Sequence, residues 1–234
     1  MAVSKSRACD KNKYAKKGRK DDLKGLFITF EGVDGCGKST QMRFLSEYLA
    51  EKGLAPVLTR EPGGCNIAEK IRDLVLDIEN KEMCDRTEAL LYAAARAQHV
   101  GEVINPAVDG GKIVLCDRFI DSSLAYQGVG RGLGIEKIMD INCFAMGDRM
   151  PDKTFFLDFP PHLAFERMSK KRVHDRLETQ EEEFYILLYN GFVKLSEMYP
   201  ERIIRIDASG NKFETQEIVQ AKMDEILAER GFSI

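Results

Sequence analysis

Three features of secreted and membrane proteins are missing from this sequence. No apolar run approaches the roughly 20 residues that a membrane-spanning helix needs, and the first residues lack the apolar segment of a secretory signal. None of the six cysteines forms a CxxC pair. Scattered cysteines in a chain of 234 residues are typical of a reducing compartment rather than of a disulfide framework. We therefore expect a cytoplasmic protein without membrane association.

Charge is unevenly distributed along the chain. Residues 1–24 hold nine Lys or Arg against three Asp or Glu, whereas the whole chain has a net charge of -3. This basic segment has almost no apolar periodicity, which predicts a disordered N-terminal arm. A nucleic-acid-binding segment or an organelle address is the alternative, but the segment has few serines and no amphipathic face. The acidic remainder argues against a nucleic-acid partner.

Short apolar runs alternate with stretches of helical spacing after residue 25, and no repeat or low-complexity linker interrupts them. The predicted strands are 26–31, 55–60, 112–117, 153–159 and 202–207. The predicted helices are 86–104, 135–147, 160–171, 179–198 and 214–229, with a further one around Phe44 to Leu49. Because parallel strands need crossovers, this alternation predicts one α/β domain at 25–234, a three-layer fold with a five-stranded parallel sheet flanked by helices.

The segment "EGVDGCGKST" directly follows the first predicted strand. It matches GxxxxGK[ST], whose glycines turn backbone N–H groups toward phosphates at a helix N-terminus. The motif therefore predicts a P-loop NTPase fold, with a ligand-free glycine turn as the alternative. The residues expected to bind the nucleotide phosphates are Gly32, Val33, Asp34, Gly35, Cys36, Gly37, Lys38, Ser39 and Thr40.

A carboxylate ends the third predicted strand, "KIVLCD". Ligands of open α/β sheets bind at the carboxyl ends of the strands, so Asp117 is expected near the phosphates. Asp117 and the Ser39 hydroxyl are candidate Mg²⁺ ligands, and Lys38 and Arg118 are candidate catalytic cations. The alternative for Asp117 is a strand-end salt bridge. The chain has neither the NKxD motif of GTPases nor the Gly-Gly-Gln signature of transport ATPases, which favours a small-molecule kinase.

Four blocks follow one another in the chain: "FITFEGVDGCGKST", "TREPGG", "EALLYAAARAQH" and "CDRFIDSSLAYQGVGRG". Continuing into "PDKTFFLDFPP", they resemble the thymidylate kinase family, of the bacterial type with a lid arginine, over roughly residues 25–230. The resemblance implies transfer of phosphate from Mg-ATP to dTMP by a homodimer. The alternatives are a kinase for another nucleoside monophosphate or deoxynucleoside, and a non-enzymatic nucleotide switch.

The resemblance also implies an acceptor site. It places Tyr92 over the thymine face and Arg96 on a carbonyl edge of the base, while Ser123 and Gln127 line the pyrimidine pocket. Tyr126 lies nearest the sugar and excludes a ribose 2′-hydroxyl. Spacings of four residues put Tyr92 with Arg96, and Ser123 with Gln127, on one helix face each.

The same resemblance implies that Glu61 and Pro62 border the acceptor phosphate and that Arg72 binds it. Pro62 and two glycines predict a tight turn, for which a cis bond before Pro62 is one possible form. Asp34 is implied to contact the 3′-hydroxyl of the dTMP sugar, with a turn-capping role as the alternative. Arg118 is expected among the dTMP-binding residues as well.

A cation-rich stretch at about 169–178 corresponds to the family's lid over ATP. The resemblance implies that a lid arginine reaches the migrating phosphoryl group, Arg176 first and Arg172 second. Without the resemblance, such a charge run is usually a solvated face.

Overall fold

The computed structural model describes residues 25–147, 149–170, 176 and 182–232. The predicted basic arm at 1–24 and the predicted lid arginine Arg172 lie outside these residues. No helix in the described ranges is long and apolar enough to cross a membrane.

Five parallel strands form one sheet in the order β2-β3-β1-β4-β5. They are β1 (Leu26–Glu31), β2 (Val57–Arg60), β3 (Ile113–Asp117), β4 (Lys153–Asp158) and β5 (Ile203–Asp207). The central strand β1 is buried along its whole length, whereas the edge strand β2 alternates between half-buried and exposed positions. The prediction of a five-stranded parallel α/β sheet is confirmed.

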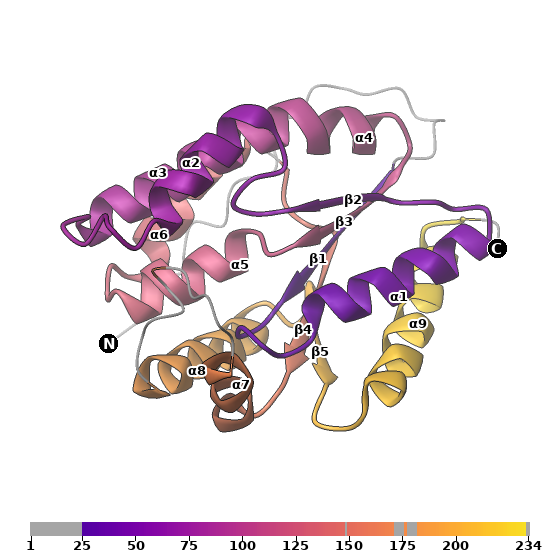
Figure 1. Cartoon of the computed structure of the whole chain (residues 1–234). Helices are drawn as coiled ribbons and strands as arrows, with labels where there is room; N and C mark the ends of the chain where they lie inside the picture. The colour runs from indigo at the N-terminus through magenta and orange to yellow at the C-terminus, as the bar shows by residue number, and fades with distance from the viewer. Residues whose placement is uncertain (1–24, 148, 171–175, 177–181, 233–234) are drawn as a thin grey trace, which may run out of the picture.

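Helices cover both faces of the sheet, with α1 and α9 side by side on one face (Figure 1). The longer helices are α1 (Lys38–Glu51), α2 (Asn66–Leu76), α3 (Asp85–His99), α6 (Ile135–Met146), α7 (Pro161–Ser169), α8 (Glu182–Met198) and α9 (Lys212–Glu229). The shorter ones are α4 (Asn105–Asp109), α5 (Ile120–Ser123) and the π-helices η1 (Val100–Ile104) and η2 (Leu124–Gly130).

Two helical segments differ from the sequence prediction. The predicted helix at 86–104 ends as an α-helix at His99, continues through the π-helix η1 and resumes as α4. Helix α2 was not among the predicted helices, although Ile67, Ile71 and Leu74 recur at helical spacing in its sequence.

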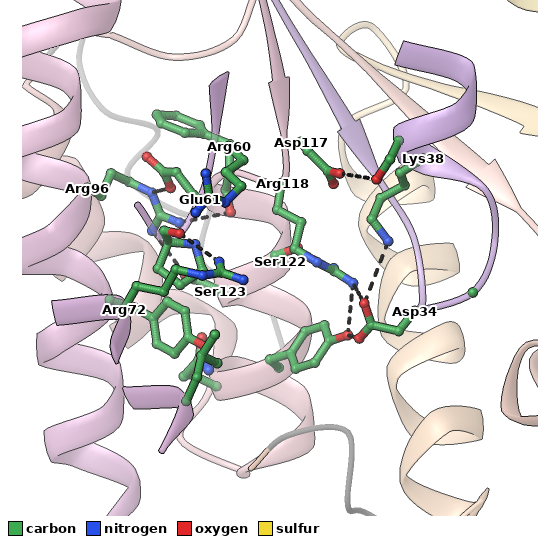
Figure 2. A pocket seen from close by; sticks show the side chains of 18 of the residues that line it. Asp34, Lys38, Arg60, Glu61, Arg72, Arg96, Asp117, Arg118, Ser122 and Ser123 are labelled. Carbon is green, nitrogen blue, oxygen red and sulfur yellow. Dashed lines mark hydrogen bonds and ion pairs between the residues drawn. The ribbon is translucent and has the colours of Figure 1, made fainter. Parts of the chain in front are cut away.

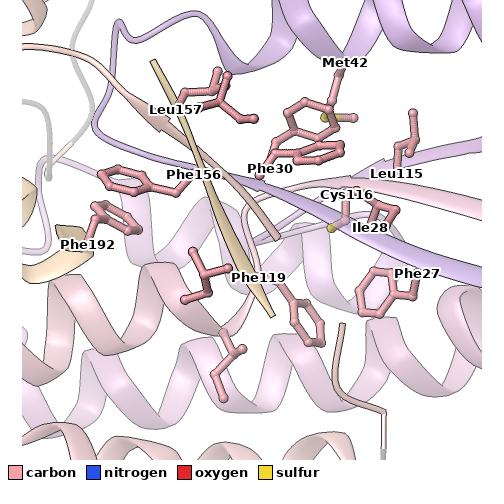
Figure 3. Packing of buried hydrophobic residues seen from close by; sticks show 14 of the residues in the cluster. Phe27, Ile28, Phe30, Met42, Leu115, Cys116, Phe119, Phe156, Leu157 and Phe192 are labelled. Atoms are coloured by element: carbon pink, nitrogen blue, oxygen red, sulfur yellow. The ribbon is translucent and has the colours of Figure 1, made fainter. Parts of the chain in front are cut away.

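The core lies on both sides of β1, as Figure 3 shows. Phe27 packs edge-on against Phe119, with ring centroids 4.9 Å apart, while Phe30 faces Met42 of α1 on the other side of the sheet. Alternate residues of a strand point to opposite faces, so an all-apolar strand joins both helix layers. This packing fixes the loops at the carboxyl ends of β1 and β3, where the phosphate motif lies.

Candidate active site

The phosphate motif forms a tight loop between β1 and α1. Gly32, Gly35 and Gly37 have φ values of 139°, 84° and 103°, which glycine adopts without steric cost. Lys38 begins α1 and folds back, donating from Nζ to the carbonyl oxygens of Gly32 and Val33, both at 3.1 Å. The loop, the helix N-terminus and the ammonium group together form an electropositive cradle of the kind that binds phosphates.

Ser39 and Asp117 meet beside this cradle. The Ser39 Oγ donates to Oδ2 of Asp117 at 2.9 Å, linking the first turn of α1 to the end of β3. A hydroxyl and a carboxylate oxygen are ligand types that Mg²⁺ accepts next to nucleotide phosphates. The pair predicted from the sequence as metal ligands therefore fits that ion chemically.

Asp34 projects from the loop toward Arg118 (Figure 2). Its Oδ1 accepts from Nη2 of Arg118 at 2.6 Å, and its Oδ2 accepts from the Tyr126 hydroxyl at 2.7 Å. Burial raises the pKa of Asp34, but the charges of Arg118 and Lys38 outweigh it and hold the pKa well below its usual range. The carboxylate is thus ionised and lies between Arg118 and Lys38, whose Nζ is 3.9 Å from its Oδ1.

Arg118 donates hydrogen bonds to both Asp34 and Tyr126. Its φ of 66° is the single positive value among the described non-glycine residues, a conformation that side chains with a β-carbon rarely adopt and that concentrates at functional sites. The guanidinium also donates to the Gly32 carbonyl at 3.1 Å and to Ser122 Oγ at 2.9 Å. It therefore lies between the phosphate loop and the segment that follows β3.

A cavity of about 400 Å³ extends from the phosphate loop to the helices beyond β2 and β3. All ten residues that the resemblance assigned to the acceptor line it, namely Asp34, Glu61, Pro62, Arg72, Tyr92, Arg96, Arg118, Ser123, Tyr126 and Gln127. Six loop residues line the same cavity, namely Asp34, Gly35, Gly37, Lys38, Ser39 and Thr40. One continuous space therefore joins the phosphate cradle to the predicted acceptor pocket.

Arg96 of α3 is only 1% exposed. Its Nε donates to Glu61 Oε2 at 2.7 Å, Nη1 donates to Ser123 Oγ at 3.0 Å and to Asn142 Oδ1, and Nη2 donates to the Phe119 carbonyl at 2.9 Å. These bonds fix the plane of the guanidinium and compensate for the burial of its charge.

Glu61 is held from its other side by a buried histidine. Oε1 of Glu61 lies 2.9 Å from His99 Nδ1, and His99 Nε2 lies 2.6 Å from Thr59 Oγ1. His99 is completely buried, and a β-carbon on Gly64 would come within 2.6 Å of its ring. The glycine in this turn is thus explained by close contact with His99.

The turn after β2 contains a cis peptide bond between Glu61 and Pro62, the form considered from the sequence. Arg72 of α2 donates from Nη1 to the Pro62 carbonyl at 2.8 Å, so it closes the side of the cavity that this turn forms. Arg60 also lines the cavity, but its guanidinium pairs with Glu69 at 2.9 Å.

Of the two predicted lid arginines, only Arg176 lies within the described residues, and it is not brought to the phosphate loop. Arg172 lies outside the described residues, and Arg176 places Nη2 2.5 Å from Glu88 Oε2 and Nε 2.9 Å from the Val75 carbonyl. A different cation reaches the loop: Arg167 of α7 donates to the Gly35 carbonyl at 3.0 Å and stacks 4.1 Å above the Phe159 ring.

Sequence reasoning missed Glu88, His99, Asn142 and Arg167. A signal existed for two of them, because Glu88, Tyr92 and Arg96 follow at intervals of four residues along α3, and His99 comes three residues later. Such spacing places all four side chains on one face of the helix, and all four are buried.

Comparison with known proteins identifies relatives over most of the chain. The family model described as Thymidylate kinase matches residues 30–219. A thymidylate kinase of Lactobacillus helveticus is 53% identical over 191 residues, covering 80% of this chain and 90% of that protein. One from Oceanobacillus iheyensis is 46% identical over 209 residues, covering 87% and 93%. The solved structure of thymidylate kinase from Ehrlichia chaffeensis has a TM-score of 0.69 at 33% identity, covering 87% of this chain and 99% of that one.

Proposed function

The chain belongs to the thymidylate kinase family, and from this premise we propose that it transfers the γ-phosphoryl group of ATP to the 5′-phosphate of dTMP, releasing ADP and dTDP. The observation that carries the proposal is the single cavity that joins the phosphate loop to all ten residues of the implied acceptor site. Donor and acceptor phosphates bound in one space can be aligned for direct transfer, which removes much of the entropic part of the barrier.

The acceptor oxygen is already anionic at neutral pH, so the transfer needs no strong general base, only positioning and charge neutralisation. Lys38 holds its ammonium over the loop and would contact the β- and γ-phosphates. Arg118, fixed by Asp34 and Ser122, would face the space between donor and acceptor. Arg167, Arg172 and Arg176 are the candidates for a further cation on the donor side.

Ser39 and Asp117 would hold the Mg²⁺ that accompanies ATP. When bound, that ion neutralises charge on the donor phosphates. The hydrogen bond between the two side chains keeps both oxygens at the same place, which supports their assignment as its ligands.

The acceptor site would hold dTMP at three points. The base would stack on Tyr92 and meet Arg96, Ser123 and Gln127, and the sugar would lie by Asp34 and Tyr126. The phosphate would contact Arg72 beside the Glu61–Pro62 turn. Tyr126 is immobilised by Asp34 and Arg118, and a fixed ring is suited to excluding a ribose 2′-hydroxyl.

We also propose a homodimer that uses the outer surface of α3 and α6. These helices pack against one another and carry two exposed apolar side chains, Leu90 at 57% and Phe144 at 92% exposure. Exposed large apolar groups on adjacent helices are typical of interaction surfaces.

Two further assignments complete the proposal. Residues 25–234 would form the kinase domain, with 1–24 as an arm and about 169–178 as its lid. The protein would act in the cytoplasm, which agrees with the free state of the five cysteines among the described residues.

The test is a coupled ADP-release assay with Mg-ATP across dTMP, dUMP, UMP, CMP and thymidine, with chromatography of the products. We expect dTMP to have the highest kcat/KM and to yield dTDP. Comparable rates with another acceptor would assign a different kinase specificity. ATP consumption without a phosphorylated nucleotide would contradict the proposal and favour a nucleotide switch.

A further inference from the structure

Glu88, in the first turn of α3, is a buried carboxylate next to the cavity but not lining it. Its side chain is 1% exposed. Oε1 accepts from Nε2 of Gln127 at 2.9 Å, and Oε2 accepts from Nη2 of Arg176 at 2.5 Å. Arg131 lies 3.4 Å from both oxygens. The proposed reaction leaves this buried group without a role.

We infer that Glu88 is a positioning residue that holds the Gln127 amide with its carbonyl oxygen toward the base, so that the pocket selects a base with an N–H at ring position 3. This inference rests on the proposed function, because it concerns how the dTMP site reads its base. It assigns the selectivity to a side chain that does not touch the base.

The chemistry of the pair fixes which end of the amide faces Glu88. An ionised carboxylate only accepts hydrogen bonds, so only the NH₂ end of Gln127 can face it. Burial raises the pKa of Glu88, but the hydrogen bonds from Gln127 and Arg176 and the charges of Arg131 and Arg176 outweigh it and lower the pKa. Glu88 is therefore ionised at neutral pH. Within the described ranges no hydrogen bond occupies Oε1 of Gln127, the atom left for the cavity.

Arg96 supplies a hydrogen-bond donor that complements the acceptor oxygen of Gln127. A guanidinium has five N–H donors and no acceptor, and four of its donors are used by Glu61, Ser123, Asn142 and the Phe119 carbonyl. One donor on Nη2 remains for a ligand. A donor from Arg96 and an acceptor from Gln127 match thymine, which presents O4 and N3–H. They mismatch cytosine, which presents an amino group and an unprotonated N3.

The test compares dTMP with 5-methyl-dCMP, which keeps the methyl group and differs at positions 3 and 4 of the ring. In E88Q the new amide can either accept from or donate to Gln127, so the orientation of Gln127 is no longer enforced. We expect the ratio of kcat/KM for dTMP over 5-methyl-dCMP to fall about tenfold, the order of magnitude of one misplaced hydrogen bond. The change should lie mainly in KM, and calorimetric affinities without ATP should show the same shift.

Two variants separate this role from a general effect of charge or folding. R131Q removes one cation near Glu88 but keeps the carboxylate, and should leave the ratio within about twofold of wild type. E88Q/Q127E exchanges amide and carboxylate, restoring the hydrogen bond with an acceptor oxygen toward the base, and should regain most of the ratio. If E88Q does not fold, the ratio measured for the double variant still tests the inference.

A wild-type enzyme that does not phosphorylate dTMP would refute the proposed function. An active wild type whose E88Q variant keeps its base preference would refute the inference alone. The inference is equally refuted where R131Q lowers the ratio as much as E88Q, or where the double variant folds but discriminates no better than E88Q.

Discussion

Ser39 and Asp117 are 78 residues apart in the chain, yet Oγ of the first donates a hydrogen bond of 2.9 Å to Oδ2 of the second. The contact forms because β1 and β3 are adjacent in the sheet and α1 begins directly beyond the loop after β1. Two side chains from separate βα units thereby meet at the carboxyl edge of the sheet, where ligands of such folds bind.

The first prediction concerns Asp117→Asn, which keeps the side-chain shape and removes the charge. We expect the Mg²⁺ concentration for half-maximal activity to rise about 10- to 100-fold, the usual cost of disturbing a metal site. Magnesium titrations of activity, and of ATP binding by calorimetry, measure this. Glu217→Gln on the exposed surface of α9 serves as the control. An unchanged magnesium requirement in D117N would remove Asp117 from the metal site.

The second prediction concerns Lys38→Ala. Its ammonium is held over the loop by the Gly32 and Val33 carbonyls and is the charge assigned to the migrating phosphoryl group. We expect kcat to fall about 10³-fold, because a positioned charge in a closed site stabilises the transition state strongly. The KM for dTMP should change little. Steady-state kinetics beside the control Lys194→Ala, exposed on α8, test this, and near-normal turnover by K38A would exclude the proposed mechanism.

The third prediction concerns Gly35, whose φ is 84°. A β-carbon there would lie 3.0 Å from the Ala164 carbonyl oxygen and 3.4 Å from Met168 Cγ, both on α7. Gly35→Ala should therefore push α7 away, disturb the Arg167 contact with the loop and raise the KM for ATP several-fold. The left-handed backbone adds about 1–2 kcal/mol of destabilisation.

Gly53→Ala is the matched control for this effect. Gly53 has a similar φ of 76°, but nothing lies within 4 Å of its added β-carbon. Urea denaturation and ATP kinetics on both variants separate backbone strain from contact with α7. Equal KM values for ATP in G35A and G53A would show that the packing of Gly35 on α7 does not matter for the donor site.

Much of this architecture could be predicted from the sequence, because the determining patterns are local. The alternation of apolar runs with helical spacing predicted the parallel sheet. The phosphate motif and Asp117 at a strand end predicted the residues of the ATP-binding side. The positions of the acceptor residues came instead from the family resemblance, since no local pattern distinguishes Tyr92 or Gln127 from ordinary helix residues.

The buried partners of those residues could not be predicted in the same way. Arg96 meets Asn142 across 46 positions and Gln127 meets Glu88 across 39. Such contacts depend on how α3 packs against α6 and on the π-helical turn η2, which no simple 3.6-residue period specifies. Arg167 illustrates the same limit, because only the packing of α7 brings its guanidinium to the Gly35 carbonyl.

The fourth prediction concerns the proposed dimer. Phe144→Glu places a charge where an apolar side chain is 92% exposed, so the variant should be monomeric by sedimentation velocity at micromolar concentration. Because the residue is exposed in one chain, thermal unfolding of the monomer should change little. Ile218→Glu on α9, where the side chain is 39% exposed, is the control and should remain dimeric. A wild-type protein that sediments as a monomer would refute the dimer directly.

The last prediction concerns Glu31, which ends β1 and is completely buried. Its carboxyl accepts hydrogen bonds from the Phe119 amide at 2.7 Å and from the Ser122 hydroxyl at 2.6 Å. Burial and the nearby Asp121 carboxylate nevertheless raise the pKa of Glu31 to about 7, against the opposing charge of Arg118 and these hydrogen bonds. The folded state therefore binds a proton that the unfolded state, with a value of 4.5, has already released.

The sign of the pH dependence follows from that difference. The stabilising contribution of the proton on Glu31 is fully present below about pH 4.5 and is lost as the pH rises through about 7, with a slope of at most about 1.4 kcal/mol per pH unit. Glu31→Gln cannot titrate, so the free energy of unfolding of wild type minus that of E31Q should fall between pH 5 and 7 and stay level at pH 8. Urea denaturation at each pH measures this difference, with the exposed Glu47→Gln as control. A difference that stays constant from pH 5 to 8 would mean that Glu31 is ionised throughout, because the charge of Arg118 and the donors from Phe119 and Ser122 then outweigh its burial.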